Sequence, residues 1–377
     1  MLLDIRPKID KEDLYGREAE LEDMLSSLRS NTPLILLLGQ RRIGKTSLLK
    51  TSLNELGGPW LYLDVRRLDE EGYSKVILYR LLSEEITRLN SSWERLGEAL
   101  KRVKGIQVAG SGIELDWSQK GPLLSSLFHF LNDWVAKSKA GKTGTGKDLI
   151  VAIDEAQLLI NMTGGKGKID FRSLIAYCYD NLRHIKFVLT GSEIGLLMDF
   201  VGSDDAKSPL YGRGKTEITL ERFERQKSLG YLTAGFKECK VKVEHGTLEK
   251  AVEKLDGIVG WLTLYGNLAA SQEKQGRLDE SQIMESVMEL AKGTASNELQ
   301  SILRRSKYYG MALRSMSMGR THWKDIKIDV ASRLGRPATD SQLSKTLATL
   351  TKLSIVDKNG AEYSIPDPVI AEYAKSL

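Results

Sequence analysis

Short apolar runs in the first half of the chain predict buried β-strands. The runs are LILLL at 34–38, LIVAI at 149–153 and IKFVLT at 185–190. Apolar runs of this length, the third of which contains Lys186, are typical of strands that are covered on both faces, as in a parallel sheet. Apolar residues with helical spacing follow the first and the third run. The pattern therefore predicts an α/β core built on a parallel sheet.

A different pattern near the end of the chain predicts three helices and a β-hairpin. The helices are expected at 308–318, 322–334 and 339–353, and an Asn359-Gly360 turn between alternating residues predicts the hairpin. Three helices followed by a hairpin describe a winged helix.

The third of these helices has one apolar face, formed by Leu343, Leu347 and Leu350. Polar side chains on such a helix can contact phosphates and base edges in a DNA major groove. The alternative is that the winged helix binds a protein or docks on the core. The residues expected on its exposed face are Ser341, Gln342, Lys345, Thr346, Thr349 and Lys352.

Residues 91–121 form an insertion between predicted core elements. Alternating apolar positions around Gly110-Ser111-Gly112 predict a β-hairpin over about 104–118. Such a hairpin is either an interaction device or an addition without a role of its own.

The loop after the first apolar run carries the strongest chemical signal. Residues 39–46, GQRRIGKT, match G-x-x-x-x-G-K-T between a strand and a helix, which is the phosphate-binding loop, or P-loop. Backbone N–H groups and the helix N-terminus then converge on phosphate. Lys45 would face the β- and γ-phosphates, and the Thr46 hydroxyl would bind Mg²⁺. The residues predicted to bind the nucleotide here are Gly39, Arg41, Arg42, Ile43, Gly44, Lys45, Thr46 and Ser47.

A second match to the P-loop spacing is predicted to be a decoy. Residues 141–148, GKTGTGKD, have Asp148 where the hydroxyl residue should be, and they precede a strand instead of following one. Their Gly, Lys and Thr content is typical of a flexible surface loop.

Two carboxylates end the second apolar run and predict the catalytic centre. Asp154 and Glu155 would lie at the carboxyl edge of the sheet, where α/β proteins bind ligands. Asp154 would hold Mg²⁺ beside Thr46, and Glu155 would polarise the attacking water. The chain has no Asn-Lys-x-Asp guanine signature, which favours ATP and ADP over guanine nucleotides.

A third polar position follows the next predicted strand. Ser192 would hydrogen-bond the γ-phosphate or the water, or it would be the N-cap of a helix with Glu193 in the first turn.

The composition indicates the cellular compartment in which the protein is expected. The 377 residues contain no apolar stretch long enough to span a membrane, and the first residues lack an apolar signal segment. Two cysteines, Cys178 and Cys239, do not make a disulfide scaffold or a cysteine-based zinc site. We therefore expect a cytoplasmic protein without a membrane partner.

The positive charge lies near the end of the chain. Residues 304–377 contain 13 Lys and Arg against 7 Asp and Glu, a net charge of +6, whereas the whole chain is +5. This asymmetry is compatible with a polyanion such as duplex DNA, and equally with a solvated helical surface.

Five segments together resemble the archaeal ATPase family. They are YGRE at 15–18, GQRRIGKTS at 39–47, VAIDEAQ at 151–157, LTGSE at 189–193 and SPLYGR at 208–213, in the order of that family. The family belongs to the STAND branch of P-loop ATPases, relatives of AAA+ proteins and of archaeal origin-recognition initiators. The resemblance implies a five-stranded P-loop ATPase core over 1–221, a helical lid over 222–303 and a winged-helix domain over 304–377.

The resemblance also assigns residues outside the P-loop. Gly16 and Arg17 would lie beside the adenine, unless this segment is only a turn and a helix start. Arg213 is similar to an arginine that reaches phosphate; the alternative is a loop arginine in a salt bridge.

The expected lid departs from the family at one position. Val259 stands where the family has a proline at the start of a lid helix, so this segment departs from the pattern in which the lid contacts the nucleotide. Trp261 is then either part of that contact or simply core. From the lid, Arg225 or Lys227 would approach phosphate.

These features favour an ATP-dependent switch with slow hydrolysis and a DNA-binding winged helix. The alternatives are an initiator-like DNA-binding protein with ATP as a structural ligand, and a STAND-type regulator whose winged helix binds protein.

Overall fold

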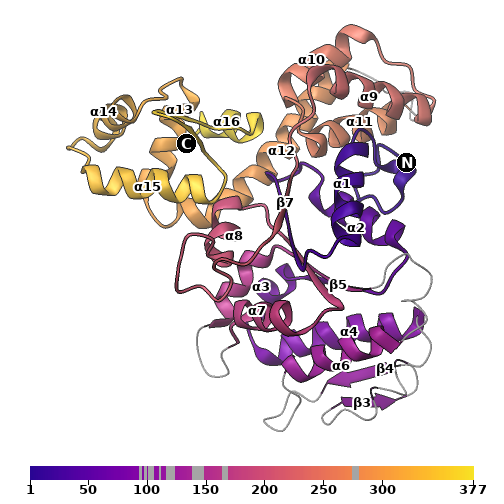
Figure 1. Ribbon diagram of the computed structural model, residues 1–377. Coiled ribbons are helices and arrows are strands. Elements are labelled where there is room, and N and C mark those ends of the chain that lie inside the picture. The colour runs from indigo at the N-terminus through magenta and orange to yellow at the C-terminus, as the bar shows by residue number, and fades with distance from the viewer. Residues whose placement is uncertain are drawn as a thin grey trace.

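The structure is a computed structural model, and it is built around a five-stranded parallel sheet with helices on both faces (Figure 1). Its strand order is β2-β5-β6-β1-β7. The structure describes residues 1–92, 96, 100, 106–109, 112–115, 124–137, 148–163, 169–273 and 280–377.

The three strands predicted from apolar runs form the middle of the sheet. They are β1 (Leu34–Leu38), β5 (Leu149–Asp154) and β6 (Ile185–Thr190), and every residue in them is buried. The edge strands β2 (Trp60–Asp64) and β7 (Thr216–Thr219) are partly exposed. β2 has the apolar run WLYL, which was not among the predicted strands, whereas β7 has the sequence TEIT with Ile218 as its apolar residue.

Two helical layers cover the two faces of the sheet. Alternate residues of β1 divide between them: Leu34, Leu36 and Leu38 belong to one apolar cluster, and Ile35 and Leu37 to the other. The Ile35 side is covered by α1 (Glu18–Arg29) and α2 (Lys45–Leu56), and the Leu34 side by α4 (Lys75–Ser92), α6 (Leu124–Lys137) and α7 (Phe171–Asn181). Short elements complete this half: α3 (Arg66–Glu71), α8 (Ile194–Val201), and 3-10 helices at Lys11–Asp13 and Ala156–Thr163.

The segment expected to hold a hairpin contains an antiparallel strand pair. β3 (Ile106–Ala109) pairs with β4 (Gly112–Leu115), and β4 lies against α4. The predicted turn residues 110 and 111 lie outside the described residues.

The second half of the described chain is mainly helical. It begins with α9 (Arg225–Cys239), α10 (His245–Leu255), α11 (Val259–Glu273) and the long α12 (Glu280–Leu303). There follow α13 (Lys307–Ser317), α14 (Trp323–Leu334), α15 (Asp340–Lys352), the strands β8 (Asp357–Asn359) and β9 (Glu362–Ser364), and α16 (Pro368–Ala374).

The predicted order of three helices and a hairpin is present between α13 and β9, and α16 is an addition that the sequence did not predict. α12 packs against α11 and also against α13 and α16, so one apolar core joins all these elements.

The apolar face of α15 is as predicted, with one correction on its polar face. Leu343, Leu347 and Leu350 are all fully buried. Thr346 is only 4% exposed and donates a hydrogen bond to the Gln342 carbonyl, so it does not lie on the exposed face. The reason is helical geometry, because position 346 lies one turn after Leu343 on the same side.

The end of α15 contacts α8 of the sheet half. Lys352 Nζ lies 2.6 Å from Asp199 Oδ2, and the Ile194 N–H donates to Ser354 Oγ at 2.9 Å. The backbones are close here, since a Cβ on Gly195 would lie 2.6 Å from Lys352 Cα. The C-terminal elements are therefore held directly against the core.

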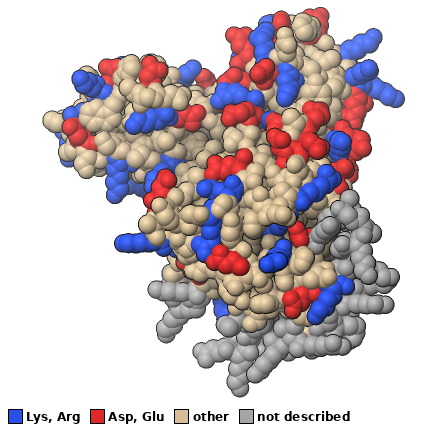
Figure 2. Space-filling view, in the orientation of Figure 1, with Lys and Arg blue, Asp and Glu red and all other residues tan. Residues whose placement is uncertain are grey.

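Charged side chains are mixed over the face drawn in Figure 2, where Lys and Arg alternate with Asp and Glu and do not form one continuous basic surface. Among the helices of the described residues, none has the length and hydropathy that a membrane span needs.

Candidate nucleotide-binding site

The P-loop connects β1 to α2, as the sequence predicted. Gly39 has φ +146°, and a Cβ there would lie 2.8 Å from the Leu220 carbonyl oxygen. Gly44 has φ +101° and precedes Lys45, the first residue of α2. Both glycines therefore adopt backbone conformations that other residues rarely take, and the loop curls over the N-terminus of α2.

Lys45 lies inside the loop. Its side chain donates from Nζ to the carbonyl oxygens of Gly39 and Gln40, at 2.7 Å each, and the residue is 6% exposed. Burial lowers the pKa of Lys45 to about 8, although the nearby carboxylates of Glu155 and Asp154 oppose that shift. A phosphate at this position would supply the negative charge that favours the protonated amine.

Asp154 and Thr46 are brought together as expected for a metal site. Thr46 Oγ1 donates to Asp154 Oδ2 at 2.9 Å, and the Tyr62 hydroxyl donates to the same oxygen at 2.7 Å. Thr190 Oγ1 lies 3.4 Å from the other carboxylate oxygen. The Asp154 carboxylate and the Thr46 hydroxyl could provide two oxygen ligands for Mg²⁺. Two protein ligands are enough, because this ion keeps several of its waters.

Tyr62 was not predicted from the sequence. It lies at the centre of β2, which pairs with β5 so that Asp64 lies beside Asp154. Burial is the main cause that raises the pKa of Tyr62, and the charge of Asp154 and its hydrogen bond raise the pKa further. Its hydroxyl therefore remains a donor to the Asp154 carboxylate.

Glu155 is held in a fixed orientation next to Asp154. Its backbone φ is +57°, in the left-handed region. Glu155 Oε2 accepts from the Ser192 N–H at 2.9 Å, from Ser192 Oγ at 3.0 Å and from Gln157 Nε2 at 2.7 Å. Three donors on one oxygen orient the carboxylate toward the cavity that it lines.

Ser192 is thus a partner of Glu155. The N-cap residue of α8 is Glu193, so the alternative that Ser192 is that N-cap is wrong. The reason is that the helix begins two residues after Ser192, which frees the serine hydroxyl for Glu155.

Arg17 contacts the P-loop at Ile43, near the start of α2, whereas Gly16 is not among the residues that line the cavity. Arg17 is 4% exposed and donates to the carbonyls of Ile43 (3.1 Å) and Glu221 (2.6 Å). Its guanidinium also lies 4.6 Å from the centroid of the Phe223 ring. Arg17 therefore joins the P-loop to the chain after β7, and it lines the cavity. Gly16 has φ +65°, and its carbonyl accepts from Lys227 Nζ at 2.9 Å.

A cavity of about 820 Å³ brings most of the predicted residues together. Its lining includes aromatic side chains that sequence reasoning missed: Tyr15 packs against Phe223 and Tyr231 at centroid distances of 6.4 and 5.6 Å. Flat apolar rings of this kind are suitable walls for a nucleobase. The sequence-predicted residues in the lining are Arg17, Arg41, Arg42, Ile43, Gly44, Lys45, Thr46, Ser47, Glu155 and Ser192.

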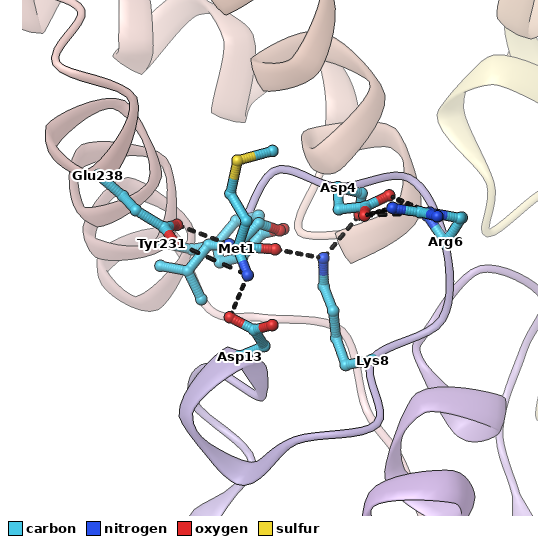
Figure 3. Close-up of polar contacts among 8 residues, drawn as sticks. Met1, Asp4, Arg6, Lys8, Asp13, Tyr231 and Glu238 are labelled. Carbon is cyan, nitrogen blue, oxygen red and sulfur yellow. Dashed lines mark hydrogen bonds and ion pairs between the residues drawn. The ribbon is translucent and has the colours of Figure 1, made fainter.

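Residues 4–8 also line this cavity. Figure 3 shows the polar contacts that Lys8 makes with Met1 and Asp4. Lys8 donates from Nζ to the carbonyls of Met1 (2.9 Å) and Asp4 (2.6 Å), and its N–H donates to Ser47 Oγ at 3.1 Å. The Tyr231 hydroxyl donates to the Leu2 carbonyl at 2.9 Å. This segment has neither periodicity nor a motif, so its position in the cavity has no signal in the sequence.

The family now follows from the comparisons. A model of an ATPase domain found predominantly in Archaea matches residues 14–264. The Walker-type ATPase PABY2304 of Pyrococcus abyssi is 34% identical over 100% of both chains, with a TM-score of 0.83. The chain belongs to this archaeal ATPase family.

Other solved structures are more distant. Drosophila ORC bound to DNA is 14% identical, covers 96% of this chain and 95% of its own, and has a TM-score of 0.45. A STAND protein with a tetratricopeptide repeat sensor from Pyrococcus horikoshii is 15% identical, covers 94% and 42%, and has a TM-score of 0.38. Neither likeness is strong enough to carry an argument. No curated protein matches the chain.

In this archaeal ATPase, Arg213 lies apart from the cavity. It donates to both carboxylate oxygens of Asp180, at 3.2 and 2.5 Å, and to the Pro209 carbonyl. The structure thus shows the salt-bridge alternative for Arg213.

The decoy loop of the ATPase, residues 141–147, lies outside the described residues. Asp148, which follows it, is bound to Lys186 Nζ at 3.0 Å. It precedes β5, whereas Asp154 ends that strand, so the two aspartates lie at opposite ends of the sheet.

In this ATPase, α11, where a lid helix was expected, begins against the P-loop despite the missing proline. Val259 lines the cavity, and a Cβ on Gly44 would lie 3.6 Å from its Cγ1. Of the two cations expected to approach phosphate, Lys227 contacts Gly16 and Arg225 is paired with Glu249 at 3.1 Å, and neither is among the residues that line the cavity. Lys227 is therefore the nearer of the two to the site.

Proposed function

We propose that this ATPase binds Mg-ATP and hydrolyses it slowly, as a switch that couples nucleotide state to its C-terminal elements. The observation that carries the proposal is that Lys45, Thr46 and Glu155 line one cavity at the carboxyl ends of β1 and β5, with Asp154 hydrogen-bonded to Thr46. In parallel α/β sheets, ligands bind at this edge.

Each of these groups has a role in phosphoryl transfer. The P-loop N–H groups and Lys45 would bind the phosphates, and Thr46 with Asp154 would hold Mg²⁺, which neutralises charge on the leaving group. Glu155 would orient water toward the γ-phosphate and accept its proton. Ser192 and Gln157 position Glu155 through their hydrogen bonds.

The C-terminal elements α13–α15, β8 and β9 are proposed to form a DNA-binding winged helix. The exposed Lys345 on α15 and the net charge of +6 in residues 304–377 support this. The second candidate is that these elements dock on protein. The contact between Lys352 and Asp199 favours it, because the end of α15 already contacts α8 of the same chain.

The nucleotide proposal is tested by the Lys45→Ala variant. It removes the cation that faces the phosphates, so calorimetry with Mg-ATP should show affinity lost by about 10²-fold or more, as for a buried charge-assisted contact. Lys147→Ala, in the decoy loop, is the matched control and should bind like the wild type. Unchanged ATP affinity in a folded Lys45→Ala variant would overturn the proposal.

A further inference from the structure

Arg42 connects the P-loop to the helical half of the chain. Its φ of 62° lies in the left-handed region, and its carbonyl accepts from the Gly260 N–H at 2.9 Å. A Cβ on Gly260 would lie 2.7 Å from Arg42 Cβ. The start of α11 therefore lies directly against this position of the loop.

The Arg42 guanidinium has two partners in that half. Its Cζ lies 4.1 Å from the centroid of the Trp261 ring, and Nη1 donates to Glu298 Oε2 at 3.1 Å. The side chains of Arg42 and Glu298 are 16% and 24% exposed. Partial burial reduces screening by solvent, so this ion pair is stronger than one on an open surface.

Glu298 faces the predicted phosphate site. It lines the same cavity as Lys45, and its Oε1 lies 3.7 Å from Nη1 of Arg41. Arg41 and Arg42 belong to the phosphate-binding loop, and guanidinium groups bind carboxylates and phosphates with the same donors. Arg41 also donates from Nη2 to Glu193 Oε1 at 3.1 Å. A nucleotide phosphate would therefore compete with Glu298 for Arg42, and with both Glu298 and Glu193 for Arg41.

Both partners of Arg42, Glu298 and Trp261, connect it to the C-terminal elements through further contacts. Glu298 lies on α12, which packs against α13 and α16. Trp261 Nε1 donates to both carboxylate oxygens of Asp367 at 3.1 Å. Asp367 is the N-cap of α16 and accepts from the Val369 N–H at 2.8 Å. Burial raises the pKa of Asp367, and the Trp261 hydrogen bond opposes the shift.

We propose that Glu298 is an internal anion that competes with nucleotide phosphate for Arg41 and Arg42, and that this competition transmits P-loop occupancy to α12 and α16. This inference rests on the proposed nucleotide binding. When phosphate takes the guanidinium groups, Glu298 loses its partners, and the contacts of Arg42 with Trp261 change with it.

The test uses Glu298→Gln in the full chain, with Glu289→Gln as the matched control. Glu289 is an exposed residue of the same helix and is not among the residues that line the cavity. Binding of a non-hydrolysable ATP analogue with Mg²⁺ is measured by calorimetry, and amide hydrogen exchange is followed in α12–α16 with and without it. Glu298→Gln should bind the analogue about 3- to 10-fold more tightly, the range for removing one partly shielded competing charge. The nucleotide-dependent change in exchange should also shrink.

Trp261→Phe is the second variant. It keeps an aromatic ring for Arg42 but removes the N–H that binds Asp367, so it should reduce the exchange response in α16 more than it alters affinity. Wild-type affinity and a wild-type exchange response in Glu298→Gln, or weaker binding there, would overturn this inference while leaving nucleotide binding established. A wild-type protein that binds no analogue would instead overturn the proposed function itself.

Discussion

Single residues in this site depend on backbone geometry that the sequence shows only in part. The P-loop, Asp154 and Glu155 could be predicted because their motif and strand context are local. Tyr62 and the aromatic wall of Tyr15, Phe223 and Tyr231 could not, since their positions follow from strand pairing and from packing between distant segments. Glu298 is the clearest case, because 256 residues separate it from Arg42.

Glu155→Gln separates binding from hydrolysis at the residue scale. The amide keeps the size of the side chain but cannot accept a proton, so Mg-ATP should still bind while turnover falls by roughly 10²-fold or more. Phosphate release and calorimetry measure the two properties on the same sample. Turnover near the wild-type rate would move the search for the water-activating group to Glu193, which also lines the cavity.

The lowered pKa of Lys45 predicts a pH dependence of nucleotide affinity. Only the protonated amine attracts phosphate, and its pKa of about 8 in the free protein means that protonation is lost as pH rises through 8. ATP affinity should therefore fall above pH 8, by at most about tenfold per pH unit. In Lys45→Ala this dependence should be absent. A wild-type affinity that is flat from pH 7 to pH 9.5 would show that Lys45 stays charged.

At the scale of elements, buried strands were the easiest to predict and edge strands the hardest. β1 and β5 are buried on both faces and have runs of five apolar residues, and β6 is apolar except for Lys186 and Thr190. The edge strand β7, with the sequence TEIT, has Ile218 as its apolar residue. The third C-terminal helix was predicted from its leucines, but α16 was missed because only seven residues form it. Contacts between elements, such as α8 with α15, have no local sequence signal at all.

Gly195 should be the sensitive point of the contact between α8 and α15. In Gly195→Ala the new Cβ would lie 2.6 Å from Lys352 Cα, and neither backbone can move easily. We expect a loss of about 1–3 kcal/mol in thermal or denaturant unfolding, the usual cost of overpacking. Amide exchange in α15 should also become faster.

Gly293→Ala, in α12, is the matched control for that substitution. A Cβ there meets nothing within 4 Å, so the better helix propensity of alanine should stabilise the protein by about 0.5–1 kcal/mol. If both variants gain stability, then the α8–α15 contact is looser than described.

For the whole molecule, the contact between α15 and α8 gives Lys352 two roles that exclude each other, which are docking on the core and binding DNA. Lys352 cannot both pair with Asp199 and neutralise a DNA phosphate. Lys345, by contrast, is exposed on α15 and is available to a partner without any rearrangement. If the proposed winged helix binds DNA, Lys345 should contribute directly, and Lys352 only after release from Asp199.

The salt dependence of duplex binding tests this arrangement. Each phosphate contact releases counterions, so Lys345→Ala together with Lys352→Ala should lower the slope of log affinity against log salt by about 1–2. Unfolding stability should barely change, because neither side chain is buried.

Asp199→Asn frees Lys352 from its partner and should strengthen duplex binding. Lys345→Ala should weaken duplex binding whether or not Asp199 is also changed. A double lysine variant with wild-type affinity and slope would exclude α15 as the DNA-contacting helix. Undetectable duplex binding at low salt would favour the protein-docking role, in which Lys352 and Asp199 form part of a permanent contact.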